Sequence, residues 1–158
     1  MRIVVLMLGA ILAFAGTVAQ ADEATEQAII KLIMDGNAYT HKNLKGMEDT
    51  VSKEGSLEFW SSGGLLNEVS PDLPPQEFES VSIRAKHITV ITLVPGEVAV
   101  AQYYSEGGMA PVGSEAVNNY RTRATQVFVK EGGKWKVRAA HWSPIQGGAG
   151  VRQTSVDD

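Results

Sequence analysis

The hydrophobic pattern begins with an apolar run at the start of the chain. Residues 3–14 are apolar apart from Gly9, they follow a single cation at Arg2, and small residues ending at Ala21 come after them. A charged start, an apolar stretch and an Ala-x-Ala ending are typical of a secretory signal peptide. The stretch is shorter than the ~20 residues of a membrane-spanning helix. We therefore expect residues 1–21 to be a signal peptide and the remainder to be secreted, with the bacterial periplasm as its compartment.

The next part of the pattern is helical. Apolar and small residues recur every three or four positions over residues 23–41, which predicts an amphipathic helix with one buried stripe. Asn43 is placed to cap a second, short helix over residues 44–52. A short strand is expected over 57–60, and the prolines and glycines of residues 61–75 predict a loop.

The second half of the chain is rich in β-branched residues and predicts strands. Four long strands are expected, over residues 83–94, 98–106, 119–130 and 134–143. Pro95-Gly96 fits the two central positions of a type II turn. Residues 131–133 close a hairpin. The connection over 105–118 carries three glycines and a proline, and we expect it to be mobile.

Helices followed by a run of strands indicate an α+β domain. We expect residues 22–146 to form one domain, with the helices on one face of a curved antiparallel sheet, and residues 147–158 to form a disordered tail. Residues 98–101 and 127–129 are apolar on both faces, so the outer face of the sheet also needs a cover. A second copy of the chain is the simplest cover, which predicts a homodimer through that face. The alternation changes phase near His87, which predicts a β-bulge there.

The composition limits the chemistry. The chain has 158 residues, no cysteine and a formal net charge of −4. Without cysteine it has no disulfides, thiolate metal site or thiol nucleophile. Its histidines, at positions 41, 87 and 141, are too scattered to suggest a metal site, and we expect neither a metal nor a cofactor. The acidic balance argues against nucleic acid as a partner and, after signal cleavage, against a membrane surface.

The last predicted hairpin carries a more specific pattern. Residues 125–137 read TQVFVKEGGKWKV, and His141-Trp142-Ser143 follows them. This threonine-containing strand, charged glycine turn, G-K-W-K-V run and H-x-S strand end resemble the end of nuclear-transport-factor-2-like domains. The resemblance is nearest to the SnoaL-like and ketosteroid-isomerase-like group, close to the association domain of calcium/calmodulin-dependent kinases. It extends over residues 24–145 and implies a cone-shaped fold, in which a strongly curved antiparallel sheet wraps around a long N-terminal helix and leaves a pocket.

The strand period places candidate residues in this pocket. Counting in twos back from Ser143 puts His141 on the same face as Trp135, which is large enough to be a core residue. His141 and Ser143 would then lie at the pocket mouth, where a histidine can transfer a proton or hydrogen-bond a ligand. The alternative is a structural histidine bonded to a neighbouring backbone group.

The remaining candidates come from other predicted elements. Gln126 faces the pocket if Phe128 packs on the first helix, and a bulge would put Arg123 there instead. Aromatic residues that can form the pocket wall, or else only pack the core, are Tyr39, Trp60 and either Tyr103 or Tyr104.

The resemblance leaves three functions open. The family's isomerases and cyclases use a pocket carboxylate, and the long strands offer none that is well placed. Our leading interpretation is an exported homodimer that binds a small, largely apolar ligand without catalysis. One alternative is a SnoaL-like isomerase, cyclase or hydratase with His141 or Asp35 as the proton carrier. The other is an oligomerisation hub with a filled pocket.

Overall fold

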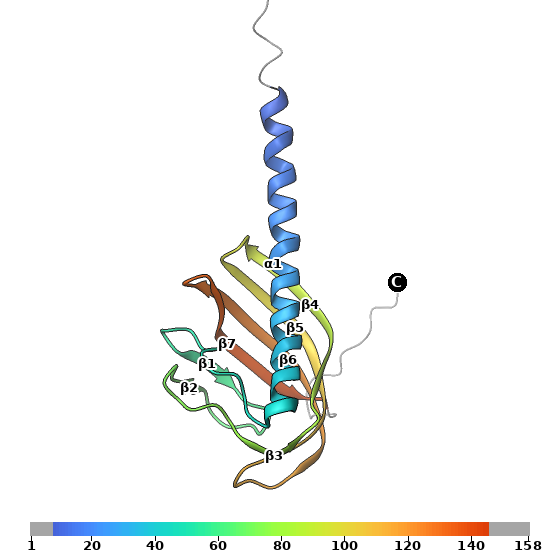
Figure 1. The fold of residues 1–158 in the computed structure, drawn as a ribbon, viewed down its shortest axis with the longest axis vertical. Coiled ribbons are helices and arrows are strands. Elements are labelled where there is room, and N and C mark those ends of the chain that lie inside the picture. Colours follow the sequence, from blue (N-terminus) through green and yellow to red (C-terminus); the bar gives the residue numbers. More distant parts are fainter. Residues whose placement is uncertain (1–7, 146–158) are drawn as a thin grey trace, which may run out of the picture.

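The computed structural model describes the backbone of residues 8–145 and the side chains of residues 22–145 (Figure 1). Helix α1 (Leu8–Asn43) begins inside the predicted signal peptide and continues without a break through the predicted helix. Its first turns project beyond the strands, and its second half lies across one face of the sheet. Within residues 8–145, no helix has a stretch long and apolar enough to cross a lipid bilayer. The tail predicted over 147–158 lies outside the described residues.

The strands form one sheet, and their bounds are β1 (Ser56–Phe59), β2 (Asn67–Val69), β3 (Phe78–Val81), β4 (Arg84–Val94), β5 (Val98–Pro111), β6 (Val117–Glu131) and β7 (Lys134–Pro144). The order across the sheet is β2-β1-β7-β6-β5, and both β3 and β4 pair with β5. All neighbours are antiparallel except β1 and β7, which run parallel. The expectation of an antiparallel sheet is therefore corrected to a mixed, curved sheet.

The core lies between α1 and the concave face of this sheet. Ile29 and Ile33 of α1 form one cluster with Phe128 of β6 and with two fully buried alanines of β5, Ala99 and Ala101. Because alanine side chains are short, the helix can approach this strand closely. The valines that alternate with these alanines point to the opposite face, which we call the outer face.

The predicted second helix, over 44–52, is wrong. The Asn43 side-chain amide donates to the Tyr39 carbonyl at 2.8 Å, so it closes α1 and does not cap a new helix. Leu44 follows with φ 52°, the left-handed conformation that commonly ends a helix. The segment after Leu44 is irregular: Lys45 forms a bridge with Glu77, and Val51 forms a parallel bridge with Val137 of β7.

The irregularities of the long strands have local causes. The predicted bulge near His87 is confirmed, because the β4–β5 register shifts between Lys86 and Thr89 and His87 has φ 52°. The mobile connection predicted over 105–118 is wrong, since strand structure fills it except at residues 112–116. The connection between β3 and β4 passes close to Gly107 of β5. A Cβ at this position would lie 2.5 Å from the Ser82 carbonyl oxygen, so only glycine fits.

Candidate functional site

The concave face carries polar and aromatic side chains beyond the core. Ala101, Gln126, Ala140 and Glu58 occupy one row across β5, β6, β7 and β1. Paired residues of neighbouring strands point to the same face, so the Gln126 and Glu58 side chains lie on the side of α1. The next row holds Tyr103, Ala124 and Trp142. We call the larger side chains here the concave polar cluster, which comprises Glu58, Trp60, Tyr103, Tyr120, Gln126 and Trp142.

Hydrogen bonds order this cluster. The Tyr103 hydroxyl donates to Gln126 Oε1 at 2.7 Å, and Trp60 Nε1 donates to Glu58 Oε2 at 2.9 Å. Burial raises the pKa of the Tyr103 phenol, and the nearby Tyr120 raises it further. A hydrogen bond with Trp142 opposes this rise in pKa, while the Glu58 carboxylate adds to it. Tyr103 is therefore a neutral hydrogen-bond donor at physiological pH.

Two buried hydroxyls on this face, those of Ser56 and Thr122, have no hydrogen-bond partner among the described residues. Thr122 lies one row beyond Tyr103, opposite Ser105, and is only 2% exposed. Its Oγ1 makes no hydrogen bond to any residue that the structure describes. Leaving a buried polar group unpaired costs about 1–3 kcal/mol, so these two hydroxyls destabilise the fold locally.

A hollow of about 640 Å³ adjoins the cluster at the β1–β2 edge of the sheet. Trp60 lies between the two, because it lines the hollow and also hydrogen-bonds Glu58. The other apolar lining residues are Met47, Val51, Val69, Leu73 and the prolines at 71, 74 and 75.

An ion pair fixes the segment that forms one wall of this hollow. The buried Lys136 ammonium on β7 contacts the Asp49 carboxylate and also donates to the Asp49 carbonyl. Lys134 Nζ lies 2.9 Å from the same carboxylate. Hydrogen bonds from Lys136 and then Lys134 lower the pKa of Asp49 to about 2. The carboxylate therefore stays ionised at any pH well above that value, and the wall remains tied to β7.

The position of His141 differs from the sequence prediction. Val127 pairs with Ala139, but the next residue, Phe128, pairs with Val137, so Arg138 is an extra residue of β7. Such a bulge reverses the side-chain phase of the strand beyond it. The expectation that His141 shares a face with Trp135 is therefore wrong.

Past this bulge, the concave positions of β7 are Ala140 and Trp142, and His141 and Ser143 lie on the outer face. The His141 ring is 5.7 Å from the ring of Phe59, with which it pairs across β7 and β1. The two residues predicted at the pocket mouth are therefore separated from the concave polar cluster by the sheet itself.

The structure divides the other predicted residues between the two faces. Trp60 and Gln126 belong to the concave polar cluster. Of the two tyrosines that were predicted as alternatives, Tyr103 belongs to this cluster and Tyr104 does not. Tyr104 and Arg123 form a cross-strand pair on the outer face.

The two candidates on α1 lie apart from the cluster. Tyr39 is exposed near the end of the helix. Asp35 is exposed, and its carboxylate forms an ion pair with Lys31 of the same helix at 2.6 Å.

The sequence reading missed Glu58, the carboxylate of the concave face. Glu58 lies on the four-residue strand β1, whereas a catalytic carboxylate was expected on one of the long strands. The alternation Ser56-Leu57-Glu58-Phe59 is also inverted, because the polar residues are buried and the apolar ones exposed. Among residues 22–145, no group of three or more acidic or histidine side chains could hold a metal ion.

Comparisons with known proteins support the fold. No protein-family model matches the chain, and no curated protein matches it. An NTF2-like protein of unknown function from Pseudomonas putida KT2440 is similar in structure, with 20% identity, a TM-score of 0.51, and coverage of 77% of this chain and 87% of that chain. The association domain of CaMKII from C. elegans gives 14% identity and a TM-score of 0.48, covering 78% of this chain and 98% of its own. Identity at these levels establishes the fold alone, and the chain has the nuclear-transport-factor-2-like (NTF2-like) α+β fold that its last hairpin predicts.

Proposed function

We propose that this chain is an exported protein that binds a small, largely apolar molecule against the concave polar cluster. The observation that carries the proposal is Trp60, which borders a 640 Å³ hollow and a buried carboxylate at once. Pockets for small molecules combine apolar and aromatic walls with a few placed polar groups. Trp60 supplies aromatic surface to the hollow, and the concave polar cluster beside it supplies the polar groups of Glu58 and Gln126.

Native mass spectrometry of the protein purified from its own host tests this proposal as a whole. We expect the mass of a chain that begins at Asp22, because residues 1–21 have the pattern of a cleaved signal peptide. We also expect added mass from a retained small molecule. A full-length chain recovered from the membrane fraction would contradict export.

Replacing Trp60 with alanine should weaken binding of a neutral apolar probe, Nile red, about five- to thirtyfold. The reason is the loss of an aromatic wall, which contributes about 1–2 kcal/mol when a ligand covers it. Fluorescence titration of purified mature protein measures the dissociation constant.

The matched control is the neighbouring Phe59→Ala. Phe59 and Trp60 are similarly exposed, at 46% and 48%, but Phe59 lies on the outer face against His141. Phe59→Ala should leave probe affinity unchanged within about twofold. Equal losses in both variants, or no loss in Trp60→Ala, would remove the hollow at the β1–β2 edge from the binding site.

Glu58 supports a second candidate function, proton transfer by an isomerase- or cyclase-like enzyme. It is 9% exposed, and its carboxylate hydrogen-bonds Trp60 beside the Tyr103 phenol, so it would replace His141 or Asp35 as the proton carrier. A retained ligand with an acidic C–H bond would then acquire deuterium in D₂O from the native protein and not from Glu58→Gln. Equal exchange with both proteins would exclude this role.

We also propose that the outer face pairs with a second copy of the chain. One half of that face is apolar, and its side chains are Ile91, Val94, Val98, Val100, Val127 and Val129. We call this set the apolar half. Ile91 is 49% exposed and Val94 is 42% exposed in the single chain, so water contacts apolar surface that a partner would cover.

A further inference from the structure

The other half of the outer face gathers positive charge from strands that are distant in the sequence. Arg84 of β4 and Arg121 of β6 are the cross-strand neighbours of Glu106 on β5. In the next row, Lys86 and Arg123 are the cross-strand neighbours of Tyr104. Lys86 Nζ is 2.6 Å from Glu106 Oε2, and an Arg121 guanidinium nitrogen is 3.9 Å from Glu106 Oε1. Four cations thus surround one carboxylate, a local excess of +3 on a chain whose formal net charge is −4.

Two of these cations have no acidic partner in the part of the chain that the structure describes. Both oxygens of Glu106 are occupied by Lys86 and Arg121. Among residues 22–145, no carboxylate forms an ion pair with Arg84 or Arg123. One Arg123 nitrogen donates to the Pro144 carbonyl at 3.3 Å, which leaves the rest of its guanidinium available to a ligand.

A hollow of about 370 Å³ lies beside Arg123, and it is lined by donors. Its outer-face side chains are His87, Thr89, Gln102, Tyr104, Arg123 and Thr125. Each of these can donate a hydrogen bond, and none is a carboxylate. The β4 bulge turns His87 to this place, where its ring stands edge-on to Tyr104 at 6.1 Å.

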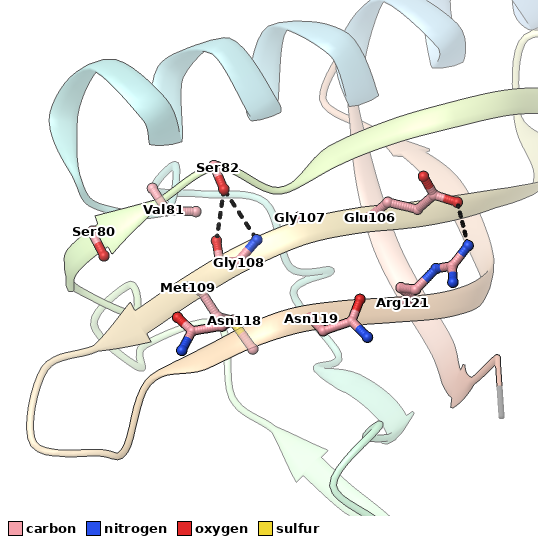
Figure 2. A pocket seen from close by; sticks show the side chains of 10 residues that line it. All are labelled: Ser80, Val81, Ser82, Glu106, Gly107, Gly108, Met109, Asn118, Asn119 and Arg121. Carbon is pink, nitrogen blue, oxygen red and sulfur yellow. Dashed lines mark hydrogen bonds and ion pairs between the residues drawn. The ribbon is translucent and has the colours of Figure 1, made fainter.

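A second hollow, of about 630 Å³, continues the polar surface toward β3 (Figure 2). Arg121 and Glu106 line it with the side chains of Asn118, Asn119, Ser80 and Ser82. Figure 2 shows Asn119 and Arg121 on the same strand, with the guanidinium directed to Glu106. This hollow offers hydrogen-bonding room for the uncharged part of a ligand whose charged group sits near Arg123.

The outer-face side chains of these two hollows, with Arg84 and Lys86, form what we call the polar half of the outer face. We propose that the polar half binds a small molecule through an oxyanion, a phosphate or a carboxylate, held by Arg123 and His87. A guanidinium fork matches two oxygens of such a group, and the net positive charge of the surrounding surface raises the local concentration of anions. The site is partly exposed, so its affinity should fall as salt rises. It lies on the opposite side of the sheet from the concave polar cluster, and either site can exist without the other.

Amide chemical-shift titration of ¹⁵N-labelled protein with inorganic phosphate and, separately, with acetate tests this site at constant ionic strength. We expect saturable shifts confined to residues 84–90, 102–106 and 121–125. Arg123→Gln should raise the dissociation constant of the anion about tenfold, the effect of losing a charge-assisted hydrogen bond. A lower dissociation constant for phosphate would identify phosphate-bearing ligands, and a lower one for acetate would identify carboxylates.

The matched control is Lys42→Gln, which removes one positive charge from the exposed last turn of α1. It should leave both affinities unchanged within about twofold. Equal weakening by Arg123→Gln and Lys42→Gln would show an effect of net charge only and overturn the proposal. Shifts that do not saturate, or that centre on Glu58, Trp60 and Trp142 of the concave polar cluster, would also overturn it. His87→Asn removes the other proposed contact and provides the same test if Arg123→Gln fails to fold, because asparagine tolerates the φ of 52° at this position.

Discussion

Replacing Phe128 with alanine should lower the free energy of unfolding by about 3–5 kcal/mol, the usual cost of emptying a buried aromatic position. Phe128 is 2% exposed and contacts the α1 cluster of Ile29 and Ile33. It also lies directly beside the β6–β7 register shift, between Val127 and Phe128. Urea denaturation of the mature protein, followed by circular dichroism, measures the change.

Leu65→Ala is the control for this prediction. Leu65 is 89% exposed, so its truncation should change the free energy of unfolding by less than about 0.5 kcal/mol. A loss below about 1 kcal/mol in Phe128→Ala would mean that α1 does not pack on the concave face as described, and the concave polar cluster would lose its cover with it.

Placing a charge in the apolar half should separate the proposed dimer. Ile91→Asp would bury a carboxylate among the valines of two copies, and an unpaired buried charge costs several kcal/mol. We expect the dimer dissociation constant to rise at least a hundredfold. A stable interface buries about 800 Å² on each partner. Sedimentation equilibrium at micromolar concentration measures the change.

Thr89→Asp is the matched control, with the same substitution two residues earlier on β4. Thr89 belongs to the polar half, beside Gln102, so its replacement should leave the dimer intact. Dissociation of both variants would extend the interface over the whole outer face and place the oxyanion site inside it. A native chain that sediments as a monomer would show that the apolar half has another cover.

The sequence predicted those features that depend on neighbours along the chain. Pro95-Gly96 closes its turn as expected, with Gly96 at φ 72° and the Glu97 amide donating to the Val94 carbonyl at 3.0 Å. The bulge at His87 was visible because polar and apolar residues change phase there. The helix, the long strands and the fold class follow from the same local periodicities.

The tertiary structure decided which residues meet. The bulge at Arg138 leaves no mark in the alternation of β7, because it depends on how β6 and β7 pair, and it moves His141 to the outer face. Glu58 reaches the concave face because the register of β1 on β7 sets it beside Ala140.

The charged surface was also beyond the sequence alone. The cations at 84, 86, 121 and 123 are scattered along the chain and become one surface only when β4, β5 and β6 align. Local periodicity fixes the phase of a side chain within an uninterrupted element. Strand register across the sheet is set by long-range packing, and that register determines which side chains form each site.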